Sequence, residues 1–173
     1  MIIASAAVVR FVAALVLLYA AAQKLVAPRL FRPTLHALRI PGVGAVTILV
    51  PLAEIGAAVG LVSFPHAMPT PVLVTGLGVS FAVVAAVAMR RGERIRCACY
   101  GEAGDAVLGV RQIAALPVWV GVALVGFLAP VGATSGVRYT AALGLVTAVA
   151  VIVAKLVPLA RENHSYMQSR ETP

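Results

Sequence analysis

The sequence predicts an all-α protein, a polytopic transmembrane helical bundle of about five spans. Hydrophobic residues make up 61% of its 173 residues, whereas soluble domains contain roughly 45–50%. Charged residues make up only 12%, about half of the usual share of roughly 25%. Apolar stretches close to the roughly 20 residues that cross a bilayer recur along the chain. These observations exclude a soluble globular domain and a disordered chain.

The first apolar stretch, residues 2–25, is interrupted by Arg10. A cleaved signal peptide has basic residues before an apolar core of about 7–15 residues. Here the apolar run is longer, and the basic residues Lys24 and Arg29 come at its end and after it. We therefore expect a helix that is retained in the protein.

Four further stretches complete the predicted bundle. They are residues 43–64, 71–89, 113–128 and 139–159. The first of them carries Glu54 and a GxxxG spacing, Gly56 and Gly60, which favours close packing of helices. The transmembrane domain is expected to cover residues 1–160, and a polar C-terminal tail, residues 161–173, follows it.

The loops between the stretches differ in charge. The first and third loops carry most of the basic residues, namely Lys24, Arg29, Arg32, Arg39, Arg90, Arg91, Arg94, Arg96 and Arg111. The second loop contains His66 but no Lys or Arg, and the only basic residue of the fourth loop is Arg138. Because Lys and Arg favour the cytoplasmic side, we expect a multi-pass cell-membrane protein with its N-terminus outside and its C-terminus inside. Pro28 and Pro33 break the first loop.

The net charge of +8 is consistent with loops that face an anionic membrane surface. A nucleic-acid-binding protein needs a basic face exposed to water, and this chain has too few polar residues to build one. We therefore expect membrane lipid as a partner and no nucleic acid.

Arg10 and Glu54 are charges within predicted spans. Each costs roughly 2.5–3.5 kcal/mol at the centre of a membrane helix when it has no partner. The two lie at similar depths if the helices are antiparallel neighbours, about 12 Å and about 15 Å from the outer ends. We expect an intramembrane ion pair, which either holds the two helices together or lines a polar pocket.

The most specific chemical motif is Cys97-Ala98-Cys99 in the third loop, which becomes cytoplasmic in the expected orientation. In an extended segment residues i and i+2 point the same way, so both sulfurs share one face. Arg94 and Arg96 lie upstream and favour the reactive thiolate. We expect Cys97 and Cys99 to be catalytic in thiol–disulfide chemistry.

Two other interpretations of this motif stay open. The thiols could be small apolar residues at a membrane boundary, or they could hold a soft ion such as Cu(I). A structural zinc site would need two further ligands, and we predict no metal site. Tyr100 and Gly101 complete the motif, and Gly101 would allow another backbone to approach closely.

The chain resembles the MauE/DoxX group of small membrane proteins over roughly residues 8–130. The residues that carry the resemblance are, in order, Arg10, Lys24-Leu25, Phe31, Ile40-Pro41, Ala53-Glu54, Arg91-Gly92 and the CxCYG motif at 97–101. The motif is similar to the CxCFG type of the methylamine-utilisation protein MauE, with Tyr100 in place of Phe. Arg111-Gln112 also departs from an expected Arg-Asn.

The resemblance implies a four-helix DoxX-like core with an additional C-terminal helix, and an association with redox or disulfide chemistry. MauE is linked to maturation of a disulfide-rich subunit beside a thioredoxin-like partner. Such maturation needs thiols that are reachable from outside, whereas the loop charges place Cys97 and Cys99 inside. Either the cysteines relay electrons from the cytoplasmic side, or the third loop folds back into the bundle.

The leading hypothesis is a membrane thiol–disulfide oxidoreductase or electron relay that supports the maturation or redox state of a thioredoxin-fold or other redox protein. A bound quinone or lipid would be compatible with this activity, although no motif indicates one. The alternatives are a non-catalytic scaffold or assembly subunit and, with less support, a small-molecule or metal transporter, because no broken-helix repeat is present in the sequence.

Overall fold

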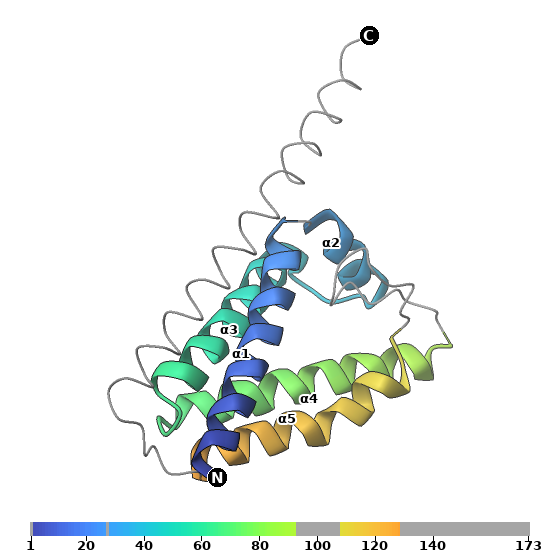
Figure 1. Ribbon diagram of the computed structural model, residues 1–173. Coiled ribbons are helices and arrows are strands. Elements are labelled where there is room, and N and C mark those ends of the chain that lie inside the picture. Colours follow the sequence, from blue (N-terminus) through green and yellow to red (C-terminus); the bar gives the residue numbers. More distant parts are fainter. Residues whose placement is uncertain (1, 27, 93–107, 129–173) are drawn as a thin grey trace.

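The computed structural model describes residues 2–26, 28–92 and 108–128 (Figure 1). These ranges form five helices: α1 (Ile2–Val26), α2 (Pro28–Ala37), α3 (Val43–Ser63), α4 (Pro69–Arg90) and α5 (Val110–Leu128). The all-α prediction is confirmed for this part of the chain. The predicted span at residues 139–159 and the tail at 161–173 lie outside the described residues.

Four of these helices are long and apolar enough to cross a membrane. They are α1 from Ala6 to Val26, α3, α4 and α5. Their outer faces expose large apolar side chains, for example Leu49 on α3, Val72 on α4 and Val118 on α5. An apolar exterior is expected where lipid rather than water surrounds the helices. The first four predicted stretches are therefore confirmed as candidate spans of a multi-pass membrane protein.

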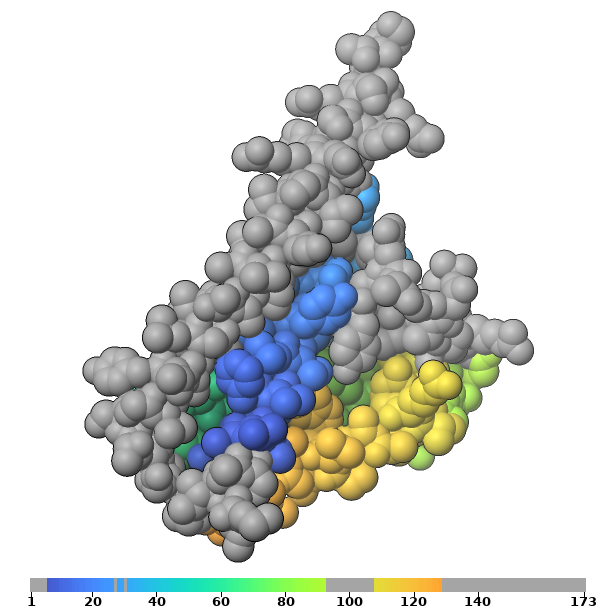
Figure 2. Space-filling model, viewed as in Figure 1, coloured from blue at the N-terminus to red at the C-terminus, as the bar shows by residue number. Residues whose placement is uncertain are grey.

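The four long helices form two closely packed pairs. α1 runs along α3, and α4 runs along α5, and the second pair crosses the first (Figure 1). Where the pairs meet, small residues form much of the core; Ala14, Ala57 and Ala58 are fully buried. Figure 2 shows α1 lying against the C-terminal end of α5. Small side chains let these helix backbones approach each other closely.

Two glycines lie where neighbouring helices approach closely. A Cβ atom on Gly60 would lie 2.6 Å from Thr70 Oγ1, where α3 meets the start of α4. A Cβ on Gly78 would lie 2.9 Å from Trp119 Cβ, where α4 meets α5. The packing role predicted for the GxxxG pair is thus confirmed at Gly60. A Cβ on Gly56 would have ordinary contact only, 4.0 Å from Leu73.

The prolines predicted a loop after the first span, but the structure has the helix α2 there. Pro28 begins the helix, a position where the missing N–H is tolerated, and Pro33 lies within it. Phe31 and Leu35 are buried, as is Leu38 directly after the helix. This spacing of three and four residues is that of an amphipathic helix. Its apolar face packs on the bundle, which outweighs the local effect of proline.

Candidate functional site

A buried ion pair joins α1 to α3 within the bundle. Lys24 Nζ lies 2.7 Å from Glu54 Oε1, and both side chains have 0% exposure. Lys24 is in the last turn of α1, and its side chain extends back toward the N-terminus, as helical side chains do. Its ammonium also donates to the carbonyl of Ala20, at 3.3 Å. The charge therefore lies about one turn deeper than the Lys24 backbone.

Aromatic rings from two other helices complete the surroundings of the ammonium. Nζ lies 5.8 Å from the ring centroid of Phe31 on α2 and 5.7 Å from that of Phe81 on α4. A cation over an aromatic face is attracted by the negative face of the ring. Lys24 is thus stabilised by a carboxylate, a carbonyl and two aromatic rings, contributed by four helices.

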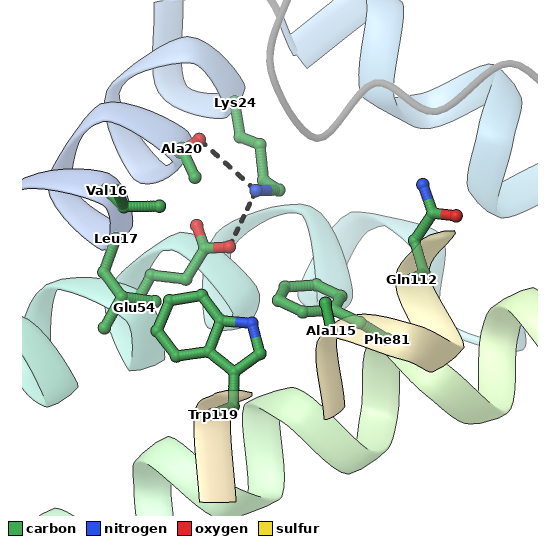
Figure 3. Close-up of a pocket in the computed structure, with 9 residues that line it drawn as sticks. All are labelled: Val16, Leu17, Ala20, Lys24, Glu54, Phe81, Gln112, Ala115 and Trp119. Carbon is green, nitrogen blue, oxygen red and sulfur yellow. Dashed lines mark hydrogen bonds and ion pairs between the residues drawn. The ribbon is translucent and has the colours of Figure 1, made fainter. Parts of the chain in front are cut away.

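The ion pair lines a cavity between α1, α3, α4 and α5 (Figure 3). The cavity volume open to a water-sized sphere is about 60 Å³. Its described lining consists of Val16, Leu17, Ala20, Lys24, Glu54, Phe81, Gln112, Ala115 and Trp119. Most of the wall is apolar or aromatic, and a few polar groups converge on it, which is the usual character of a ligand pocket.

Only one of the two carboxylate oxygens of Glu54 has a partner within the described part of the chain. Oε1 accepts from Lys24 Nζ, while Oε2 is buried and accepts no hydrogen bond from a described residue. Buried polar atoms in proteins are satisfied in the great majority of cases. This oxygen therefore marks Glu54 as a residue that has capacity for a further interaction.

The expected ion pair between Arg10 and Glu54 is wrong, because each residue has a different partner. Arg10 Nη2 donates to the carbonyl oxygens of Gly126 (3.0 Å) and Val125 (3.4 Å) in the last turns of α5. Both carbonyls belong to the last described turns of α5. Glu54 instead takes Lys24, whose side chain reaches into the bundle from the end of α1.

Lys24 was not predicted as a site residue, because in the sequence it lies at the end of a span, among the loop charges. The signal was present in its spacing from Arg10, since the two lie about four helical turns apart. A residue at that spacing falls on the same helix face. Both are buried on that face, together with Leu17 between them. Gln112 and Trp119 were also missed, because a single polar or aromatic residue in an apolar helix carries no distinctive pattern.

The residues predicted for thiol chemistry all fall in the part of the third loop that the structure does not describe. Cys97, Cys99, Arg94, Arg96, Tyr100 and Gly101 lie outside the described residues. Their roles stay predictions. The helix ends on either side of the loop are described, and both lie near Leu38, directly after α2. Arg91 Nη1 donates to the Leu38 carbonyl at 3.2 Å, and Leu38, Ala88 and Leu108 form one buried cluster.

A bundle of apolar helices with charged side chains directed into its interior defines a polytopic membrane protein. The sequence matches the family model described as Methylamine utilisation protein MauE over residues 2–113, more than half of the chain. The protein belongs to the MauE family, which confirms the family resemblance. A search among curated proteins and a search among solved structures each found no match.

Proposed function

We propose that this MauE-family membrane protein carries out thiol–disulfide exchange, or relays electrons, through Cys97 and Cys99. The exchange would support the maturation or the redox state of a partner protein, expected to have a thioredoxin fold. The observation that carries the proposal is the family match, because residues 2–113 include the whole CxC motif. Arg94 and Arg96, close upstream in the sequence, would favour the thiolate form of the cysteines.

The exchange needs no reactant beyond the partner's own disulfide or dithiol. The thiolate of one cysteine attacks the partner disulfide and forms a mixed disulfide, and one partner thiolate leaves and takes up a proton. The second cysteine, after losing its proton, then attacks the mixed disulfide. This step releases the other partner thiol and leaves a Cys97–Cys99 disulfide. Two electrons pass to the partner, and the reverse sequence returns them.

The packing on either side of the loop supports this proposal. The end of α4 and the residues just before α5 both contact Leu38, directly after α2, through Arg91 and through Leu108. A reactive segment anchored at both ends loses less conformational freedom when it meets a partner. Such anchoring suits a short motif that must present two sulfurs to another protein.

We also propose the orientation that the loop charges indicate, with the N-terminus outside and the third loop on the cytoplasmic side. In the described residues the basic side chains of Arg29, Arg32 and Arg39 follow the end of α1. Arg90 and Arg91 lie at the end of α4, which packs near the same region. Basic residues gathered at one end of a bundle favour the cytoplasmic face.

Trapping of a mixed disulfide tests the proposed exchange. Cys97→Ser and Cys99→Ser proteins are expressed separately in membranes, and complexes are separated on non-reducing gels. We expect at least one of the two variants to form a complex that dithiothreitol separates by reducing the mixed disulfide. The double variant, with both cysteines replaced by serine, should form no such complex. Ala98→Ser, which keeps both thiols, serves as the matched control and should show a gel shift on reduction and alkylation.

The opposite result would favour the scaffold alternative. If the wild-type thiols stay reduced under every oxidant, and no variant traps a partner, the cysteines take no part in exchange. A non-catalytic assembly subunit would then bind its partner equally well with both cysteines replaced by serine.

A further inference from the structure

We propose that Glu54 is a proton-exchange site inside the bundle, reached by water in the cavity that it shares with Lys24, Gln112 and Trp119. The ligand of this site is a proton, which water in the cavity delivers and removes. The inference uses only described residues of α1, α3, α4 and α5, and it does not depend on the chemistry proposed for the cysteines.

The first argument is the unsatisfied oxygen of Glu54. Oε2 is buried and accepts no hydrogen bond from the residues that the structure describes, although Glu54 has 0% exposure. Leaving a buried polar atom without a partner costs about 1–3 kcal/mol, and more for a charged group. A water molecule in the adjoining cavity removes this cost by donating to Oε2.

The second argument is the size and polarity of the cavity. A water molecule needs about 10–15 Å³ of such volume and two to four polar partners, and the cavity offers about 60 Å³. The side-chain oxygen of Gln112 already accepts from the Gly109 N–H, at 2.9 Å. Its amide NH₂ is therefore the group that can donate to cavity water. Lys24 Nζ and Trp119 Nε1 are further donors in the lining (Figure 3).

The position of Gln112 gives water a route to the end of the bundle. Gln112 lies in the first turn of α5 and is half-buried. Glu54, near the middle of α3, is fully buried. Cavity water between the two side chains would connect the interior carboxylate to the aqueous end of the bundle.

The third argument is that Lys24 keeps its charge stabilised whichever form Glu54 takes. A proton from cavity water adds to Oε2 and gives a neutral carboxyl group, and the pair changes from net zero to one positive charge. The ammonium then retains the Ala20 carbonyl and the rings of Phe31 and Phe81. Release of the proton to cavity water restores the ion pair.

No other titratable group competes with this exchange among the described residues that line the cavity. Besides the ion pair, α4 contributes Phe81 and α5 contributes Gln112, Ala115 and Trp119. Phe31 faces the ammonium from α2. Arg10 belongs to the other end of α1, where it binds carbonyls of α5. The charge seen by Glu54 from the described lining is therefore that of Lys24.

Infrared spectroscopy of the full chain in lipid nanodiscs tests the proposal. The carbonyl band of a protonated carboxyl group is followed as pH is changed and as water is replaced by D₂O. Glu54→Gln assigns the band by removing it, and Glu54→Asp assigns it by moving it if the first variant does not fold. Ala115→Leu fills the cavity, and Ala114→Leu adds the same atoms to an exposed position on the same helix.

We expect a band from Glu54 that appears reversibly as pH falls and that exchanges with D₂O. In Ala115→Leu this exchange should be slower by about tenfold or more, equivalent to about 1.4 kcal/mol of added barrier. Ala114→Leu should exchange at the wild-type rate. A Glu54 band that never responds to pH overturns the proposal. So does an exchange rate that Ala115→Leu leaves unchanged, or that both variants lower equally.

Discussion

The guanidinium of Arg10 donates to the carbonyl oxygen of Gly126, 116 positions later in the sequence, at 3.0 Å. The contact joins α1 to the last described turns of α5. These are the first and the last described helices along the chain. His66 Nδ1 donates to the neighbouring Phe127 carbonyl at 2.8 Å, from the connection between α3 and α4. The last described turn of α5 is thus joined by hydrogen bonds to two other parts of the bundle, α1 and the connection between α3 and α4.

Replacing Arg10 should loosen this end of α5. Arg10→Leu removes a charged donor and leaves the carbonyls of Val125 and Gly126 without it. Hydrogen bonds to charged groups contribute about 1.5–3 kcal/mol, so we expect a loss of that order in the free energy of unfolding. Denaturant unfolding in bicelles measures it. Arg29→Leu, at an exposed position, is the control and should change stability little; an equal loss there would contradict the assignment.

The Lys24–Glu54 pair should behave as a coupled unit. Lys24→Met strands a buried carboxylate, and Glu54→Leu strands a buried ammonium. Removing one member of a buried pair costs about 3–5 kcal/mol. The double variant removes both charges, so its loss should be smaller than the sum of the two single losses.

A double-mutant cycle of unfolding free energies in detergent or bicelles measures this coupling. Losses that simply add would show that the contact between Nζ and Oε1 contributes nothing to stability. Pairing Glu54→Leu with Arg10→Leu provides the comparison. That cycle should show little coupling, because Arg10 contacts α5 and not Glu54.

Two glycines of the same helix should respond differently to alanine. Gly60→Ala places a methyl group 2.6 Å from Thr70 Oγ1 and disturbs the bond from that hydroxyl to the Phe64 carbonyl. Overpacking of this kind costs typically about 1–3 kcal/mol. Gly56→Ala meets only Leu73 at 4.0 Å and should be neutral or slightly stabilising. Thermal unfolding of both proteins decides the matter, and equal effects would contradict the packing.

The proposed orientation predicts which loops an impermeant reagent can reach in intact cells. In a background with Cys97 and Cys99 replaced by serine, a single cysteine is introduced at Ala67 or at Arg32. Both positions are exposed. Ala67→Cys should react with an impermeant maleimide, and Arg32→Cys should react only after the cells are permeabilised. The reverse pattern would place the third loop outside.

Span existence could be predicted from the sequence because length and apolar content decide it locally. α3 matched residues 43–64 to within one residue, and α4 and α5 began a few residues before their predicted starts. The helix α2 was missed, since Pro28 and Pro33 favour a loop locally while Phe31, Leu35 and Leu38 bind the segment to the bundle. Tertiary burial, which no local pattern contains, decided between these two tendencies.

The charged partners were harder to predict than the spans. Matched depth paired Arg10 with Glu54, but depth of the backbone differs from depth of the charge when a side chain is long. Lys24 reaches back along α1 to the Ala20 carbonyl, so a residue at the helix end satisfies a carboxylate near the middle of α3. Arg10 donates instead to backbone carbonyls of α5, and every residue of a chain carries a backbone carbonyl.

The division of the ion pair between two helices has a consequence for biogenesis. Glu54 lies in the middle of α3, where an unpaired charge costs several kcal/mol during insertion from the translocon. Its counter-charge belongs to α1, which leaves the ribosome earlier. Pairing with Lys24 lowers this cost, so integration of α3 should be favoured when α1 remains beside it as the chain is made.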